Sequence, residues 1–176
     1  SKLESKTLYA ANKIACEQIL YAYHSSYDIP FSILRICVPY GNNIGHEYSY
    51  GTLKFFLEQW NKNKKIVLFG DGSTKRTLSH IEDICKTFYG LAKSTHLVNS
   101  IYNMPGENYS LAELALLITR SPEKIIFKEW PNMHLKIETG STYFAQEALD
   151  INPTIHPNGQ LKSWVSEMRS KEIINV

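Results

Sequence analysis

Hydrophobic residues early in the chain recur with a helical period. Their spacing of three or four residues predicts an amphipathic helix over residues 8–23, with an apolar stripe made of Leu8, Ala11, Ala15, Ile19 and Ala22. The apolar run at 31–36 (FSILRI) is short enough for a buried strand, and the Pro, Tyr, Gly and Asn residues at 39–43 predict a turn after it. The first predicted unit is therefore helix, strand and turn.

The same alternation continues along the chain. The patterns predict further strands near 65–69, 77–80, 100–104 and 124–128, and helices near 53–61, 81–93 and 159–168. Another helix should begin at Ser110, because Ser110 and Glu113 form a capping box ahead of an apolar run. Helices that alternate with strands predict an α/β fold with some parallel pairing. No low-complexity linker divides the chain. If the protein has two lobes, we therefore expect the chain to pass between them more than once.

Composition narrows the class of protein. Hydrophobic residues make up 43% and charged residues 20%, which is ordinary for a globular protein. The formal net charge is only +2 and the basic residues are scattered, so we expect no nucleic-acid partner. No apolar run approaches the roughly 20 residues of a membrane span, and the six histidines show no metal-binding spacing. Three scattered cysteines favour a cytoplasmic protein, with Cys16 and Cys37 as small hydrophobes.

The first helix carries a candidate acid–base pair. Tyr9 and Lys13 are four residues apart on one helical face, and an ammonium beside a phenol favours the phenolate form. The same spacing recurs in Tyr50/Lys54 and Tyr89/Lys93. Spacing alone is therefore compatible with ordinary residues on one helical turn. Only the first pair opens a helix that leads directly into a predicted buried strand, whose carboxyl end is where open α/β sheets bind ligands.

A second candidate follows the predicted strand at 65–69. The segment GDGSTKRT contains glycines and a lysine, but Lys75 stands where a P-loop needs glycine, and the continuation is extended rather than helical. We therefore reject a P-loop and predict a tight hairpin that delivers Arg76. A guanidinium is suited to two-point contact with phosphate, although a single arginine after a turn is often a surface charge.

Taken in order, these segments resemble the extended short-chain dehydrogenase/reductase family of NAD-dependent nucleotide-sugar epimerases and dehydratases. YAANK is similar to the YxxxK motif of that family, and PFSILRICVPYG to its LRxxNxYGP strand and turn. KIVLFGDGSTKRTLSHIEDI resembles the GDGxxxR segment, and SIYNMPGENYSLAELALLI and ALDINPTIHPNGQLKSWV resemble two later segments. Five co-linear segments make the resemblance far more specific than any one motif.

The resemblance implies a set of roles. Tyr9 would be the catalytic acid–base, Lys13 would favour its ionised form and bind the nicotinamide ribose, and Tyr40 would also contact the cofactor. Phe69 would pack on the nucleotide base, or else serve as a core aromatic, and Arg76 would hold the diphosphate of a nucleotide sugar. The cofactor would be NAD, with NADP left open. The helix of Tyr9 would form a homodimer interface.

The sequence also departs from the family pattern. The glycine-rich GxxGxxG turn has no counterpart, so the chain resembles the carboxyl-terminal half of such an enzyme. Residues 1–42 and 77–106 would then complete the Rossmann-type cofactor sheet, and 43–76 and 107–176 would form the substrate lobe. Val38 and Thr77 replace an expected asparagine and aspartate, and Lys136 is a weak substitute for a late arginine. The alternative is a non-catalytic sugar-nucleotide-binding subunit, or a degenerate fragment, that needs a partner.

Overall fold

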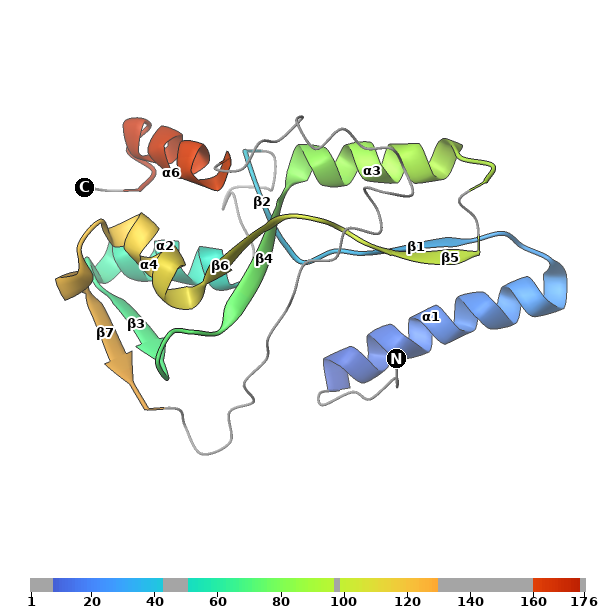
Figure 1. Cartoon of the computed structure of the whole chain (residues 1–176), viewed down its shortest axis with the longest axis horizontal. Coiled ribbons are helices and arrows are strands. Elements are labelled where there is room, and N and C mark those ends of the chain that lie inside the picture. The colour runs from blue at the N-terminus through green and yellow to red at the C-terminus, as the bar shows by residue number, and fades with distance from the viewer. Residues whose placement is uncertain (1–7, 43–50, 97–98, 130–159, 175–176) are drawn as a thin grey trace.

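The computed structural model describes residues 8–42, 51–96, 99–129 and 160–174. Strands and helices alternate along it, as the sequence pattern predicts (Figure 1). The helices are α1 (Leu8–Tyr27), α2 (Gly51–Asn63), α3 (Ile81–Lys93), α4 (Leu111–Thr119) and α6 (Gln160–Ser170), with a short 3-10 helix η2 (Pro122–Lys124). The strands are β1 (Ser32–Arg35), β2 (Val38–Tyr40), β3 (Ile66–Phe69), β4 (Lys75–His80), β5 (Ser100–Asn103), β6 (Glu107–Ser110) and β7 (Ile125–Lys128).

The strands pair in three small sheets, and most of the pairing is parallel. β1 pairs with β5 and β3 with β7, both in parallel. β4 lies between β2, which is parallel to it, and β6, which is antiparallel. The fold is therefore α/β, as predicted. Strand β4 pairs with β2, from the predicted cofactor sheet, and with β6, from the predicted substrate lobe.

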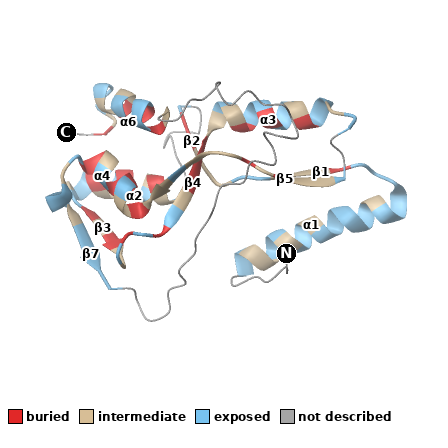
Figure 2. Ribbon diagram, viewed as in Figure 1, coloured by how far each residue is buried: buried red, intermediate tan, exposed pale blue. Residues whose placement is uncertain are grey.

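The main core lies where α2, α4 and α6 pack against the sheets of β3 and β4 (Figure 2). Its fully buried side chains include Leu53, Ile66, Leu78, Leu114, Ile118, Leu161 and Met168. The predicted capping box starts α4. Ser110 Oγ accepts a hydrogen bond from the Glu113 N–H, and Glu113 Oε2 accepts one from the Ser110 N–H at 2.7 Å. These contacts supply partners for N–H groups that the helix itself leaves unpaired.

The two remaining helices lie on opposite sides of the β1–β5 pair (Figure 1). α3 buries Ile84, Thr87 and Leu91, whereas α1 has no buried residue (Figure 2). The apolar stripe of α1 does not face the sheet, since Leu8 is 87% and Ile19 is 53% exposed. Cys16 is exposed too, so it does not pack as the small hydrophobe that the sequence pattern predicts; Cys37 is half-buried.

Three sequence predictions of local structure are corrected. Residues 39 and 40, predicted to begin a turn, belong instead to strand β2; among the described strands β2 lies at the edge of its sheet, where a proline that lacks an N–H is tolerated. The glycine turn before Arg76 is not a hairpin, because β3 and β4 belong to different sheets. β1 is half-buried rather than buried, since among the described strands it pairs only with β5.

Candidate active site

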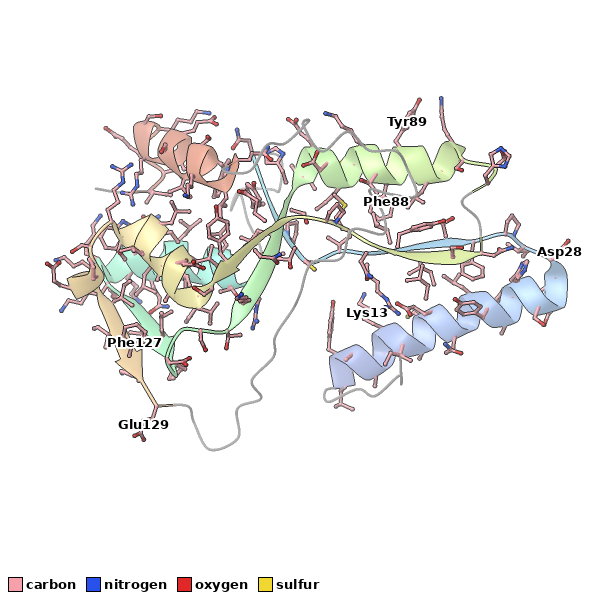
Figure 3. The ribbon with its side chains drawn as sticks, in the orientation of Figure 1. Lys13, Asp28, Phe88, Tyr89, Phe127 and Glu129 are labelled. Carbon is pink, nitrogen blue, oxygen red and sulfur yellow. The ribbon has the colours of Figure 1, made fainter. Side chains whose placement is uncertain are left out.

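The Tyr9–Lys13 pair lies in the first turns of α1. Lys13 Nζ is 5.5 Å from the centroid of the Tyr9 ring, and Tyr9 is 73% exposed. Lys13 projects from the side of α1 on which the β1–β5 pair lies (Figure 3). Tyr89 and Lys93 adopt a similar arrangement in α3, with 4.7 Å between Nζ and the ring centroid. The local contact does not distinguish the two pairs, so only their positions in the fold can.

An ion pair fastens α1 to the carboxyl end of β1. Arg35, the last residue of β1, donates two hydrogen bonds to Glu17, from Nε at 2.8 Å and from Nη2 at 2.7 Å. The Arg35 guanidinium lowers the pKa of Glu17, and the Glu17 carboxylate raises the pKa of Arg35. Because Lys13 is one helical turn before Glu17, this contact places the candidate pair at the carboxyl end of β1.

Strand pairing connects the strand of Arg76 to the segment that follows β1. Arg76 lies in β4, whose register with β2 aligns Leu78 with Val38, three residues after β1 ends. The Arg76 side chain is half-buried, and its Nη1 donates a hydrogen bond to the Lys75 carbonyl at 2.8 Å. Helix α1 and strand β4, far apart in sequence, are thus each connected to the β1–β2 segment, the first by an ion pair and the second by strand pairing.

The turn before Arg76 is fixed by α4. The N–H groups of Leu111 and Ala112 donate to the carbonyls of Thr74 and Gly72, at 2.9 and 3.0 Å. Gly70 and Gly72 have φ angles of 75° and 73°, a conformation that favours glycine. The glycines predicted from the sequence therefore do form a tight turn, which is anchored to α4 and, through the Gly70 N–H that donates to the Lys128 carbonyl at 2.8 Å, to β7.

Phe69 ends β3, on the other side of this turn. Its backbone pairs with Lys128 of β7, and its side chain is half-buried. A half-buried aromatic at a strand end suits either predicted role, namely stacking on a nucleotide base or packing in the core. Base binding by Phe69 stays a prediction.

Tyr40 has an environment that the sequence did not indicate. It is 1% exposed, its ring packs edge-on against His80 and Trp164, and its hydroxyl donates to Glu107 Oε2 at 3.3 Å. Burial, together with the Glu107 carboxylate, raises the pKa of Tyr40. Cofactor contact by Tyr40 stays a prediction, but a buried side chain with an engaged hydroxyl favours a packing role.

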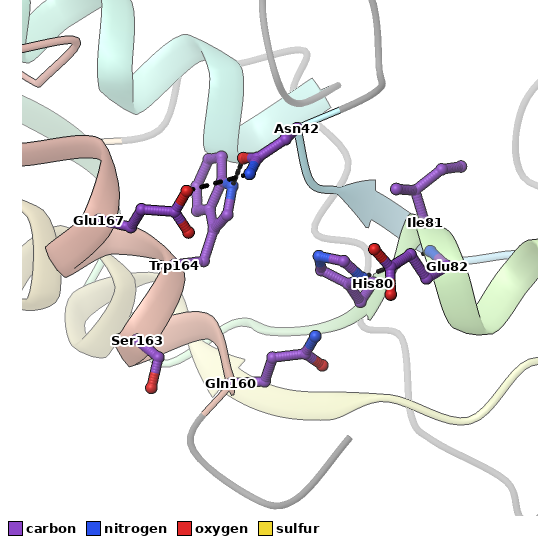
Figure 4. A pocket seen from close by; sticks show the side chains of 8 residues that line it. All are labelled: Asn42, His80, Ile81, Glu82, Gln160, Ser163, Trp164 and Glu167. Atoms are coloured by element: carbon purple, nitrogen blue, oxygen red, sulfur yellow. Dashed lines mark hydrogen bonds between the residues drawn. The ribbon is translucent and has the colours of Figure 1, made fainter. Parts of the chain in front are cut away.

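A cavity of about 270 Å³ lies at the far end of β4 from Arg76 (Figure 4). Its walls come from α6, from the end of β4 and the start of α3, and from the segment after β2. The residues that form them include Asn42, His80, Glu82, Gln160, Trp164 and Glu167. Asn42 bridges two of them, because its Oδ1 accepts from Trp164 Nε1 at 2.9 Å and its Nδ2 donates to Glu167 Oε1 at 3.2 Å. None of the predicted site residues lines this cavity, and no sequence motif indicated it, because its walls are brought together only by folding.

Comparison with known proteins identifies the family. The model of the NAD dependent epimerase/dehydratase family matches residues 1–104, and this chain belongs to that family. A UDP-glucuronate 4-epimerase of Thermodesulfobacterium geofontis is 27% identical over 164 residues, which are 90% of this chain and 49% of that protein. An uncharacterized UDP-glucose epimerase of Bacillus subtilis is 28% identical over 111 residues, 62% of this chain and 34% of that protein.

Solved structures agree on the fold. The dTDP-glucose 4,6-dehydratase DesIV of Streptomyces venezuelae, solved with NAD bound, superposes with a TM-score of 0.77 at 21% identity, over 98% of this chain and 54% of that one. The chain thus spans about half the length, or less, of the relatives it matches. Within the described residues, no helix has the length and apolarity needed to cross a membrane.

Proposed function

We propose that this chain supplies the acid–base and substrate-binding residues of an NAD-dependent nucleotide-sugar epimerase or dehydratase. The observation that supports this proposal is that α1, which holds Tyr9 and Lys13, is joined by the Glu17–Arg35 pair to the carboxyl end of β1, while Arg76 lies in β4, which pairs with the strand that follows β1. Open α/β folds bind ligands at this end of their strands, and the three residues supply a proton-transfer group, a cation beside it and a phosphate-binding guanidinium.

The proposed chemistry at Tyr9 is proton transfer. When bound, NAD supplies the acceptor for a hydride from a sugar carbon. Tyr9, as the phenolate, would take the proton of the hydroxyl on that carbon, so that loss of the C–H hydride and the O–H proton leaves a carbonyl. The Lys13 ammonium lies beside this tyrosine, 5.5 Å from the centroid of the Tyr9 ring.

Lys13 also fits a cofactor-binding role. Its ammonium shares an exposed helix face with Tyr9, so one lysine could donate to ribose hydroxyls and still lie beside the tyrosine ring. A lysine ammonium has three donors, which is enough for both tasks. We assign the cofactor contact on this chain to Lys13 and take NAD, the cofactor named by the family description, as the nucleotide.

The substrate we propose is a nucleotide-diphosphate sugar. Arg76 would contact the diphosphate through its guanidinium and Phe69 would contact the base. The names of several similar proteins support this class, since they are epimerases of UDP sugars and a dehydratase of a dTDP sugar. Val38, which stands where the family pattern has an asparagine, packs against the main core.

The exposure of α1 bears on assembly and on the alternative function. Leu8, Ile19, Tyr23 and Tyr27 are all at least half exposed on this helix, an apolar surface that a second copy of the chain would cover in a homodimer. The same exposure favours the alternative, a non-catalytic nucleotide-sugar-binding subunit whose α1 is covered by a different partner.

The variant Tyr9→Phe separates the two functions. In the natural full-length protein with NAD and a nucleotide sugar, we expect turnover to fall by at least about a hundredfold, because the proton acceptor is lost. Tyr89→Phe is the matched control, since Tyr89 has the same lysine contact elsewhere in the fold, and it should keep full activity. If Tyr9→Phe retains the activity of the unmodified protein, the catalytic assignment is wrong and the binding-subunit alternative takes its place.

A further inference from the structure

The contact between Glu17 and Arg35 is more specific than an ordinary surface ion pair. Both carboxylate oxygens of Glu17 accept from Arg35, at 2.8 and 2.7 Å, and the Glu17 side chain is only 13% exposed. A two-point contact between a planar guanidinium and a carboxylate fixes their relative orientation as well as their distance. It therefore constrains how α1 is rotated and where it lies along β1.

This constraint acts close to the candidate catalytic pair. Tyr21 and His24 also contact the segment leading into β1, at the end of the helix away from Tyr9. Glu17–Arg35 lies nearer to the start of α1 than these contacts. At about 1.5 Å per residue, Lys13 lies about 6 Å and Tyr9 about 12 Å beyond Glu17 along the helix axis.

The pair also controls local charge. Glu17 is four residues after Lys13, a spacing at which a carboxylate and an ammonium on one helix can meet. Arg35 occupies both Glu17 oxygens and balances their charge. The Lys13 ammonium lies instead beside the Tyr9 ring, at 5.5 Å from its centroid. Without Arg35, Glu17 would become an uncompensated anion within reach of Lys13.

We propose that Arg35 is a positioning residue, which holds the start of α1 against β1 and keeps the Glu17 carboxylate from drawing Lys13 away from Tyr9. The proposal rests on the proposed function, because it concerns where the Tyr9–Lys13 pair is held. It assigns to Arg35 and Glu17 an effect on turnover that is exerted entirely through other residues.

The two single variants should behave differently. Arg35→Gln loosens α1 and also frees Glu17, so kcat should fall by about tenfold to a hundredfold while KM for the nucleotide sugar stays within about twofold. Glu17→Gln loosens α1 but leaves no anion near Lys13, so its loss of kcat should be smaller. The double variant Glu17→Gln/Arg35→Gln should recover to the level of Glu17→Gln. Arg35→Lys keeps the charge without the planar fork and should fall between the unmodified protein and Arg35→Gln.

Controls separate position from folding. Glu58→Gln removes an ion pair with Lys54 in α2, at 3.8 Å, and should leave kcat unchanged. Calorimetric titration with the nucleotide sugar gives the fraction of each variant that is folded and competent to bind. Hydrogen exchange followed by mass spectrometry should show faster exchange over residues 8–17 in Arg35→Gln, and unchanged exchange in α3.

The outcomes are distinct. If Tyr9→Phe is inactive and Arg35→Gln keeps its kcat, the proposed function stands and the positioning role is overturned. The positioning role is also overturned if kcat falls only in proportion to the fraction of protein that can bind the nucleotide sugar. It is overturned as well if the kcat of the double variant is no higher than that of Arg35→Gln. If Tyr9→Phe is fully active, the proposed function itself fails and this inference fails with it.

Discussion

The hydroxyl of Tyr40 donates a hydrogen bond to Glu107 Oε2 at 3.3 Å, and through it β2 is joined to β6 and to the start of α6. The same carboxylate oxygen accepts from the Leu161 N–H at 2.8 Å, and the other accepts from the Tyr109 hydroxyl at 3.3 Å. Burial and the Glu107 carboxylate raise the pKa of Tyr109 to about 12. One carboxylate thus holds three segments that are distant in sequence.

This contact makes the role of Tyr40 testable. Tyr40→Phe removes one donor to Glu107 and keeps the ring in the core, so we expect a loss of about 0.5–1.5 kcal/mol in the free energy of unfolding. The affinity for NAD should be unchanged. Urea unfolding measures the first quantity and fluorescence titration with the nucleotide the second. Weaker NAD binding at unchanged stability would instead support the cofactor contact implied by the family resemblance.

Arg76 should determine affinity for the substrate rather than stability. Arg76→Gln removes a charged donor to the diphosphate, and such hydrogen bonds contribute about 1.5–3 kcal/mol, so the Kd for a nucleoside diphosphate should rise by roughly tenfold to a hundredfold. The neighbouring variant Lys75→Gln is the control, because that side chain is exposed at the same strand end. Equal effects of the two variants would point to a general charge effect and contradict a specific role of Arg76.

Gly106 is required by close packing. A Cβ on this residue would lie 2.3 Å from the Leu78 carbonyl oxygen, a backbone atom that cannot move without disturbing β4. We expect Gly106→Ala to lower the free energy of unfolding by at least about 2 kcal/mol, measured in urea. Gly51→Ala is the matched control: Gly51 has open space around it, and only its φ of 62° opposes a side chain, at a cost of about 1–2 kcal/mol.

The Glu17–Arg35 pair should lose its effect in acid. Arg35 lowers the pKa of Glu17, so the pair contributes stability above the ordinary glutamate pKa of about 4.3 and loses it as the pH falls through the lowered value. Arg35 is 43% exposed, so the contribution should not exceed about 1 kcal/mol. The stability difference between the unmodified protein and Glu17→Gln, measured from pH 7 down to pH 3, should shrink toward zero. A difference that stays constant over this range would contradict the ion pair as its source.

Local sequence patterns predicted many of the helices and strands. Helix α3 has the predicted bounds, and the capping box at Ser110 and Glu113 starts α4 as expected. Strand β2 was missed because Pro39 and Gly41 are strong turn signals, and only its position at a sheet edge makes the proline acceptable. Strand β6 was missed because its sequence, Glu-Asn-Tyr-Ser, lacks an apolar alternation; it forms through its antiparallel register with β4.

The candidate site was predictable to the extent that it depends on motifs. Tyr9, Lys13 and Arg76 follow from spacing and from the order of segments. The position of Arg76 relative to the end of β1 depends on the register of β2 and β4, which a single sequence does not reveal. For the same reason, nothing local marks Glu17 as the partner of Arg35, 18 residues away, or Tyr40 as a core residue bonded to Glu107.

The attachment of the glycine turn to α4 has a consequence for ligand recognition. The first N–H groups of α4 bond to the carbonyls of Thr74 and Gly72, and the helix itself is anchored in the core by Leu114 and Ile118. The backbone that carries Arg76 is therefore preorganised before any ligand arrives. Binding a diphosphate there would order a side chain but almost no main chain, so little conformational entropy would be lost and more of the contact energy would remain as affinity.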